Sequence, residues 1–172
     1  MKVSELKILI AGIGNIFNGD DGFGVEVVRK LQERALPDDV NVIDFGIRSF
    51  DLAFALVDGY QAVILVDALQ RKESPGTLYL FEPDLDHADE LMPVAMEGHG
   101  LHPAQVLKLA TLYGNLPERI FLIGCEPMTV TFSEEGQLGL SPPVQANLDE
   151  AIKLIESLIQ RLQRESMVAN ES

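Results

Sequence analysis

Short apolar runs of strand length alternate with segments of helical periodicity along this chain of 172 residues. The run 62–66, Ala-Val-Ile-Leu-Val, is apolar throughout, which is typical of a strand covered on both faces of a sheet. Further strands are predicted at 7–11, 40–44, 77–81 and 119–124, and helices at 25–37, 50–57, 103–113 and 144–162. The alternation predicts an α/β fold, a three-layer α/β/α arrangement whose mainly parallel, twisted sheet is flanked by helices.

The composition fits one domain. A chain of this length with 47% hydrophobic residues can bury one sizeable core and is short for two. We therefore expect a single α/β domain over residues 1–162. Residues 163–172 are mostly polar and are predicted to form a disordered C-terminal tail.

The charge and the cysteine count limit partners and compartment. A net charge of −14 and a pI near 4.4 argue against binding to nucleic acid or to an anionic membrane surface. Cys125 is the single cysteine, which excludes an internal disulfide and fits a reducing compartment. The apolar run near the N-terminus is too short for a signal-peptide core or a membrane span. These features predict a cytoplasmic protein.

A glycine-rich loop, residues 12–24, directly follows the first predicted strand. The dinucleotide-binding fingerprint fails, because Phe17 stands where its third glycine would be. No Gly-Lys-Ser/Thr closes the loop, so the phosphate-binding P-loop fails as well. The loop instead carries Asp20 and Asp21. A glycine loop that presents carboxylates suits a cation or acid/base chemistry better than an anion.

Other polar residues follow strands of the predicted sheet. Ligands of open parallel sheets collect outside the carboxyl ends of the strands. Asp21, Asp67 and a loop histidine, His99, are expected to meet in one cleft there, and Asp44 and Glu126 also close strands. Two carboxylates and an imidazole suit Mn, Ni or Zn better than Ca or Mg. The metal could be a catalyst, or it could belong to another molecule that this cleft recognises.

Simpler interpretations apply to several of these residues. An aspartate at a strand end, such as Asp44 or Asp67, is often a helix cap or an Asx-turn. Asp20 beside Asp21 is either a turn pair or a dyad that shares a proton. Cys125 follows apolar residues and reads as a buried core residue, not a nucleophile. His102 begins a helix, and His87 lies in an acidic run.

Several motifs together resemble a known family. They are Gly12-x-Gly14-Asn15 leading to Asp20-Asp21-x-x-Gly24-Val25, Val66-Asp67-Ala68, the His99 loop before Val106-Leu107, Gly124-Cys-Glu-Pro127 and Gly139-Leu-Ser-Pro142. In this order, over about residues 6–162, the chain resembles the hydrogenase maturation endopeptidases of the HyaD/HybD/HoxW type. The resemblance implies an enzyme that removes the C-terminal extension of a [NiFe]-hydrogenase large-subunit precursor after nickel insertion.

The resemblance also implies roles for individual residues. Asp21, Asp67 and His99 would contact nickel carried by the substrate, which serves as a recognition element, and no tightly bound cofactor is expected. Asp67 or Asp21 would activate water, and Asp44 would have a supporting role. Many members have Glu at the position of Asp21, so either the loop sits closer or Asp20 shares the task. A non-catalytic docking module or metallochaperone, another metal-dependent hydrolase and a nucleotide-binding enzyme remain the alternatives.

Overall fold

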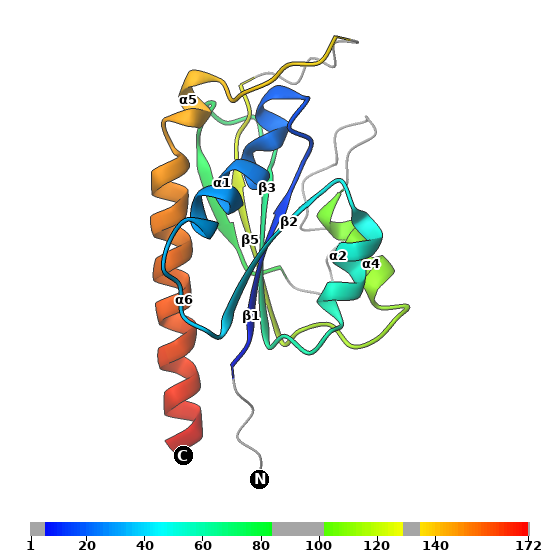
Figure 1. The fold of residues 1–172 in the computed structure, drawn as a ribbon, viewed down its shortest axis with the longest axis vertical. Coiled ribbons are helices and arrows are strands. Elements are labelled where there is room, and N and C mark those ends of the chain that lie inside the picture. Colours follow the sequence, from blue (N-terminus) through cyan, green and yellow to red (C-terminus); the bar gives the residue numbers. More distant parts are fainter. Residues whose placement is uncertain (1–5, 84–101, 129–134, 172) are drawn as a thin grey trace.

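The computed structural model describes residues 6–83, 102–128 and 135–171. These residues contain a five-stranded sheet with the strand order β2-β1-β3-β5-β4 (Figure 1). The strands are β1 (Ile8–Ile13), β2 (Val40–Gly46), β3 (Ala62–Ala68), β4 (Leu78–Phe81) and β5 (Arg119–Cys125). All neighbouring pairs are parallel except β4 and β5, which are antiparallel. The predicted α/β fold with a mainly parallel sheet is confirmed.

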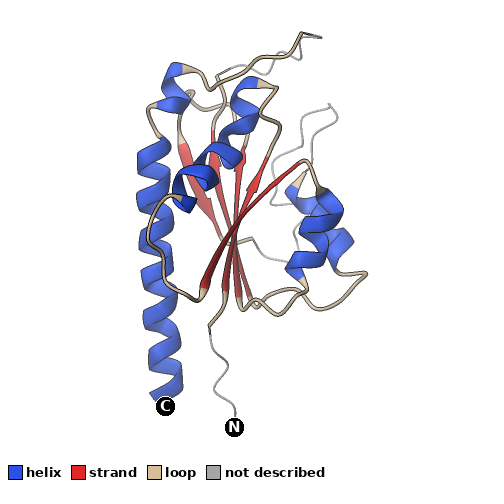
Figure 2. Cartoon of the chain, in the orientation of Figure 1, coloured by secondary structure: helices blue, strands red, loops and turns tan. Residues whose placement is uncertain are grey.

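Helices cover both faces of the sheet (Figure 2). The helical elements are the 3-10 turn η1 (Gly19–Gly22), α1 (Phe23–Gln32), α2 (Ser49–Leu56), α4 (Pro103–Ala110), α5 (Pro142–Gln145) and α6 (Leu148–Glu171). Helices α1 and α6 pack on one face, and α2 and α4 pack on the other. None of the helices in the described ranges is long and apolar enough to cross a membrane.

The sheet separates two apolar cores because successive strand residues point to opposite faces. In β3, Ile64 and Val66 pack with α1 and α6, whereas Val63 and Leu65 pack with α2 and α4. Strands β1, β3 and β5 are almost wholly buried. Their unbroken apolar runs are therefore explained by cover on both faces.

The C-terminal prediction is wrong, because α6 continues through Glu171 where a disordered tail was expected for residues 163–172. Long-range contacts explain the difference. The Gln163 amide donates to Asp39 at 3.1 Å, and Glu165 pairs with Arg119 at 3.0 Å and with Arg161, one helical turn earlier, at 3.7 Å. A polar helical segment is thus held by the rest of the domain.

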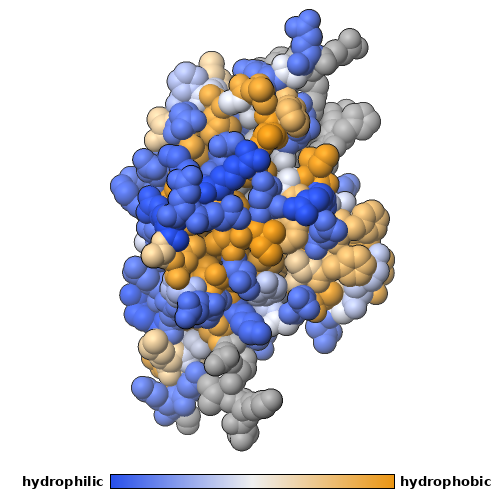
Figure 3. Space-filling model, in the orientation of Figure 1, coloured by the Kyte–Doolittle hydropathy of each residue, from blue (hydrophilic) through white to orange (hydrophobic). Residues whose placement is uncertain are grey.

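The two helical layers differ at the surface. Figure 3 shows hydrophilic residues over much of the side that carries α1 and α6, and more apolar residues over α2 and α4. Helix α2 buries Leu52 and Leu56 but leaves Phe50 and Phe54 more than half exposed. The Phe54 ring contacts that of Tyr113, with 4.6 Å between the ring centroids.

Candidate active site at the carboxyl edge of the sheet

Asp67 is a buried carboxylate near the end of the central strand β3. Its side chain is only 5% exposed, and its Oδ1 accepts a hydrogen bond of 2.8 Å from the Ala68 amide. The alternation with Val63 and Leu65 assigns Asp67 to the face covered by α2 and α4. This carboxylate directly follows the apolar residues of β3 and lies at the edge where open sheets bind ligands.

Asp21 comes to the same edge from the glycine-rich loop. It lies in η1 and is partly buried, and its Oδ2 accepts a hydrogen bond of 2.8 Å from the Asn15 amide. Gly14 has φ +130°, and a Cβ at that position would lie 1.8 Å from the Asp21 carbonyl oxygen. Only glycine allows the loop to close this tightly on Asp21.

Two further glycines seat the start of α1 against the sheet. A Cβ on Gly24 would lie 2.0 Å from the Val66 carbonyl oxygen, and a Cβ on Gly12 would lie 2.6 Å from the Gly24 carbonyl oxygen. The backbone of α1 therefore touches the strand that carries Asp67. This close approach brings η1 and the end of β3 together, as their mutual contacts also indicate.

Asp21 and Asp67 are electrostatically coupled. Burial raises the pKa of Asp67 well above its usual value, the charge on Asp21 raises it further, and the hydrogen bond from Ala68 lowers it in part. Burial also raises the pKa of Asp21, against the lowering effect of the Asn15 amide. In such surroundings, ionisation of one carboxyl makes ionisation of the other less favourable.

Asp20 has a different environment from its neighbour. It is 3% exposed, and three groups donate to its carboxylate: the Met128 amide at 2.8 Å, and the amide and hydroxyl of Ser141, each at 2.7 Å. These donors come from the segments that follow β5 and precede α5. The Asp20 carboxylate is thus engaged in hydrogen bonds inside the protein. The possible Asp20–Asp21 dyad has no support in these contacts.

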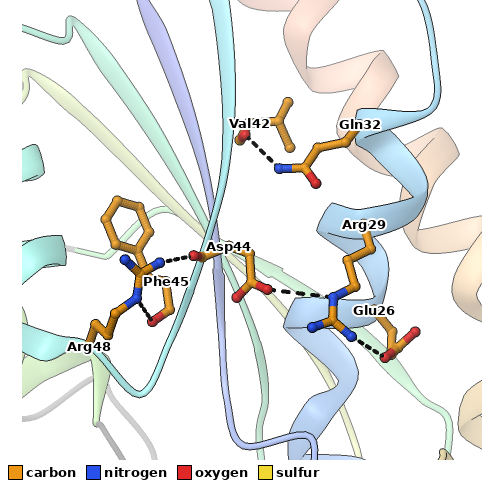
Figure 4. A network of polar contacts seen from close by, with 7 residues as sticks. All are labelled: Glu26, Arg29, Gln32, Val42, Asp44, Phe45 and Arg48. Carbon is orange, nitrogen blue, oxygen red and sulfur yellow. Dashed lines mark hydrogen bonds and ion pairs between the residues drawn. The ribbon is translucent and has the colours of Figure 1, made fainter.

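Asp44 lies on the opposite face of the sheet from Asp67. Figure 4 shows its side chain directed toward Arg29 of α1, and Oδ2 lies 3.5 Å from Nε of that arginine. Arg29 also pairs with Glu26, and the Asp44 carbonyl oxygen accepts a hydrogen bond from Arg48. The end of β2 therefore contributes an ion pair with α1, and its aspartate is not brought to Asp67.

The remaining candidates that lie within the described residues have structural roles. His99 and His87 lie outside the described residues. Nδ1 of His102 accepts from the Ala104 amide at 3.2 Å, so this histidine caps α4. Glu126 is buried and accepts from the Arg71 amide at 2.7 Å and from the Tyr79 hydroxyl at 2.6 Å, which links β5 to the neighbouring loop and strand.

Cys125 is a core residue, as the sequence predicted. It is 1% exposed and packs between β5 and the layer of α1 and α6. Burial, and next the charges of Asp20 and Glu126, raise the pKa of the thiol to about 12. A thiol with this pKa supplies almost no thiolate at neutral pH and is unsuited to nucleophilic attack.

A metal ion would find only part of a ligand set in the described portion of the chain. Within it, no cluster of three or more His, Cys, Asp or Glu side chains could hold one. Asp21 and Asp67 supply carboxylate oxygens at one edge, and a third ligand would have to come from elsewhere. A site of this kind can contact a metal that another molecule holds.

Comparison with known proteins identifies the family. A family model described as hydrogenase maturation protease matches residues 25–158. This chain belongs to the hydrogenase maturation protease family. A Methanocaldococcus jannaschii protein that is provisionally named as such a protease is 36% identical over 154 residues, which cover 89% of this chain and 96% of that protein.

Members of the hydrogenase maturation protease family from bacteria support the assignment. The hydrogenase 2 maturation protease of Escherichia coli is 27% identical over 94% of this chain and 99% of its own length. The structure of the hydrogenase maturating endopeptidase HybD from E. coli matches with a TM-score of 0.76, covering 91% of this chain and 93% of that one at 27% identity. The endopeptidase class predicted from the motifs is confirmed at the level of the family.

The structure also indicates residues that sequence reasoning did not single out. Asn15 and Ser141 both fall within the motifs of the resemblance, yet no role followed from their spacing. Their roles depend on a backbone amide bound to Asp21 and on a hydroxyl and amide bound to Asp20. The contact between Ser141 and Asp20 joins positions 121 residues apart and becomes visible only in the fold.

Proposed function

We propose that this protein removes the C-terminal extension of a [NiFe]-hydrogenase large-subunit precursor after nickel insertion, with Asp21 and Asp67 at the centre of the reaction. The observation that carries the proposal is the pairing of the buried Asp67 carboxyl with the partly buried Asp21 carboxyl at the carboxyl edge of the sheet. Family membership supplies the reaction class, a maturation protease. We place the reaction in the cytoplasm, in line with a single buried thiol and no disulfide.

The electrostatics of the pair suit peptide hydrolysis. A carboxyl whose pKa is raised keeps its proton to higher pH than an ordinary carboxyl and can donate it, and an ionised neighbour can accept a proton from water. The side chains that supply these groups are fixed by hydrogen bonds from Asn15 and Ala68.

Nickel enters this proposal as part of the substrate. Carboxylate oxygens together with an imidazole suit a borderline divalent cation. Asp21 and Asp67 would supply the oxygens, and His99 is proposed as the nitrogen ligand. The precursor would be accepted only when it carries nickel. Asp44 is proposed to support the site indirectly, through the ion pair that ties the end of β2 to Arg29 of α1.

The test is an intact-mass measurement on a large-subunit precursor incubated with the protein. We expect one internal cut with the nickel-loaded precursor and none with the nickel-free form. Asp67→Asn, Asp21→Asn and His99→Ala should each abolish cleavage or lower its rate by at least about 100-fold. Asp39→Asn is the matched control, because Asp39 lies at the opposite end of the strands, immediately before β2, and should leave the rate unchanged.

Three outcomes would overturn parts of this proposal. An unchanged precursor mass together with nickel-dependent binding would indicate a docking module or metallochaperone. Equal cutting of nickel-free and nickel-loaded precursor would exclude nickel as the recognition signal. Cleavage at the normal rate by Asp67→Asn would remove the carboxyl pair from the mechanism, and the hydrolase would then use other groups.

A further inference from the structure

The buried carboxylate of Asp20 joins three segments that are distant in sequence. Met128 follows β5, Ser141 precedes α5, and Asp20 itself lies in η1. The three donors to its carboxylate lie at 2.7–2.8 Å, and the side chain is almost inaccessible to solvent. Charged acceptors in such contacts make stronger hydrogen bonds than neutral ones.

A second connection holds the same turn from its other side. The Gly19 amide donates to the Gln137 carbonyl oxygen at 2.7 Å, and the Gln137 amide donates to the Phe17 carbonyl oxygen at 2.7 Å. The turn that carries Asp20 and Asp21 is therefore attached to the segment that leads to Ser141. Among these contacts, only those of Asp20 use a charged side chain.

Asp21 is the next residue along this turn, and its position depends on the turn. Its carbonyl oxygen lies against Gly14, and its Oδ2 accepts from the Asn15 amide. A shift of η1 would move the Asp21 carboxylate relative to Asp67, because Asp67 is fixed separately in β3. Small displacements of reacting groups have large effects on rate, of the order of 100-fold for about 1 Å.

We infer that Asp20 is a positioning residue: its carboxylate fixes η1 to the segments around Met128 and Ser141 and so holds Asp21 in place beside Asp67. This inference rests on the proposed function for its effect on catalysis. It assigns different tasks to the two adjacent aspartates. Asp21 faces the reacting groups, whereas Asp20 acts through the hydrogen bonds that hold the turn.

Asp20→Asn is the primary variant, because an amide is nearly isosteric with a carboxylate but cannot accept hydrogen bonds through both of its terminal atoms. Whichever way the new amide is oriented, its NH₂ group would face a backbone N–H, either that of Met128 or that of Ser141, and that hydrogen bond would be lost. Ser141→Ala is the graded variant, since it removes only the hydroxyl donor and keeps both amides. Asp39→Asn is the matched control, a hydrogen-bonded aspartate remote from η1.

The first readout is structural and needs no substrate. In ¹H–¹⁵N NMR spectra, the Asn15 amide reports directly on its hydrogen bond to Asp21. We expect this resonance to move upfield in Asp20→Asn, to move less in Ser141→Ala and to stay in place in Asp39→Asn. An unshifted Asn15 amide in folded Asp20→Asn protein would overturn the inference. If Asp20→Asn does not fold, an unshifted amide in Ser141→Ala would overturn it.

The second readout is cleavage of the nickel-loaded precursor, with the rate normalised to the folded fraction from urea unfolding. We expect Asp20→Asn to lower kcat by about 10- to 100-fold and to change KM by less than about threefold. A normal kcat in the folded variant would overturn the catalytic part. If the wild-type protein does not cleave the precursor, the proposed function fails, and the Asn15 resonance still decides whether Asp20 positions Asp21.

Discussion

Asp21 lies close enough to Asp67 for its charge to raise the pKa of the Asp67 carboxyl, although one residue comes from a loop and the other from the central strand. The fold creates this relationship by pressing the backbone of α1 onto β3 at Gly24. Charging both carboxyls, one buried and one partly buried, is unfavourable for the stability of the folded protein. Carboxyls with raised pKa values at the edge where open sheets bind ligands are typical of functional sites.

Asp67→Asn is expected to stabilise the protein at neutral and alkaline pH. The pKa of Asp67 is higher in the folded state than its usual value of 3.8, so this carboxyl favours folding below the unfolded pKa and loses that contribution as the pH rises through the folded pKa. The asparagine has no charge to bury. For a domain of this size, each kcal/mol gained raises Tm by about 2–4 °C.

Thermal unfolding of wild-type and Asp67→Asn protein, measured from about pH 4 to about pH 8.5 in steps of roughly half a pH unit, tests this prediction. The gain in Tm should be largest at high pH and should diminish as the pH falls toward the usual carboxyl range. Asp58→Asn, a change at an exposed aspartate, serves as control. A gain of the same size at every pH would contradict the electrostatic explanation.

Gly14→Ala is expected to destabilise the protein and to disturb the candidate site. The new Cβ would meet the Asp21 carbonyl oxygen at 1.8 Å, and φ of +130° is unfavourable for alanine. Gly59→Ala is the matched control, because Gly59 also has positive φ, +84°, but nothing lies within 4 Å of its Cβ position. The control should lose about 1–2 kcal/mol, and Gly14→Ala distinctly more, in urea unfolding. Equal losses would show that the contact with Asp21 is unimportant.

Cys125 is expected to be unreactive in the folded protein and dispensable for cleavage. Its pKa of about 12, against an ordinary 9.0, implies a thiolate fraction lower by about 10³-fold, and burial restricts access further. Reaction with a chromogenic disulfide reagent should be slow in buffer and rapid in urea. Cys125→Ala should process the nickel-loaded precursor at the normal rate. Loss of processing by a folded Cys125→Ala protein would contradict this prediction and would make the thiol a candidate catalytic group.

The last part of α6 is expected to be protected from hydrogen exchange. Amides around Glu165 should exchange at least about 10-fold more slowly than in an unstructured peptide, because the segment is held by Arg119 and Asp39. Glu165→Ala should reduce this protection and lower stability by about 0.5–1 kcal/mol. Glu150→Ala, which affects only the exposed pair with Lys153, is the control. Coil-like exchange beyond residue 163 would contradict the helix.

The sequence was informative wherever local pattern determines structure. The unbroken apolar run of β3 predicted a strand buried on both faces, and Cys125 was correctly predicted as a core residue. The position of Asp67 at a strand end followed from the same pattern. Such features depend on a few neighbouring residues and on the period of the chain.

Features that depend on distant contacts could not be predicted in this way. Asp20 and Asp21 are adjacent and chemically identical, yet one is held by Ser141 and the other by Asn15. The face of the sheet on which Asp44 lies depends on the register of β2 and on which helices pack against it. The side chain pairs with Arg29 of α1. The helix extends through residues 163–171, where Gln163 contacts Asp39 and Glu165 contacts Arg119, and no local pattern contains these contacts.

The contact between Gly14 and the Asp21 carbonyl has a consequence for the kinetics of recognition. The glycine-rich loop packs tightly against the Asp21 carbonyl, so this turn has little conformational entropy to lose when a substrate binds. Association should then proceed without a slow rearrangement of η1. A preformed site would then distinguish one precursor from another by the group that each brings to the carboxyl pair, and not by a change in the protein's own conformation.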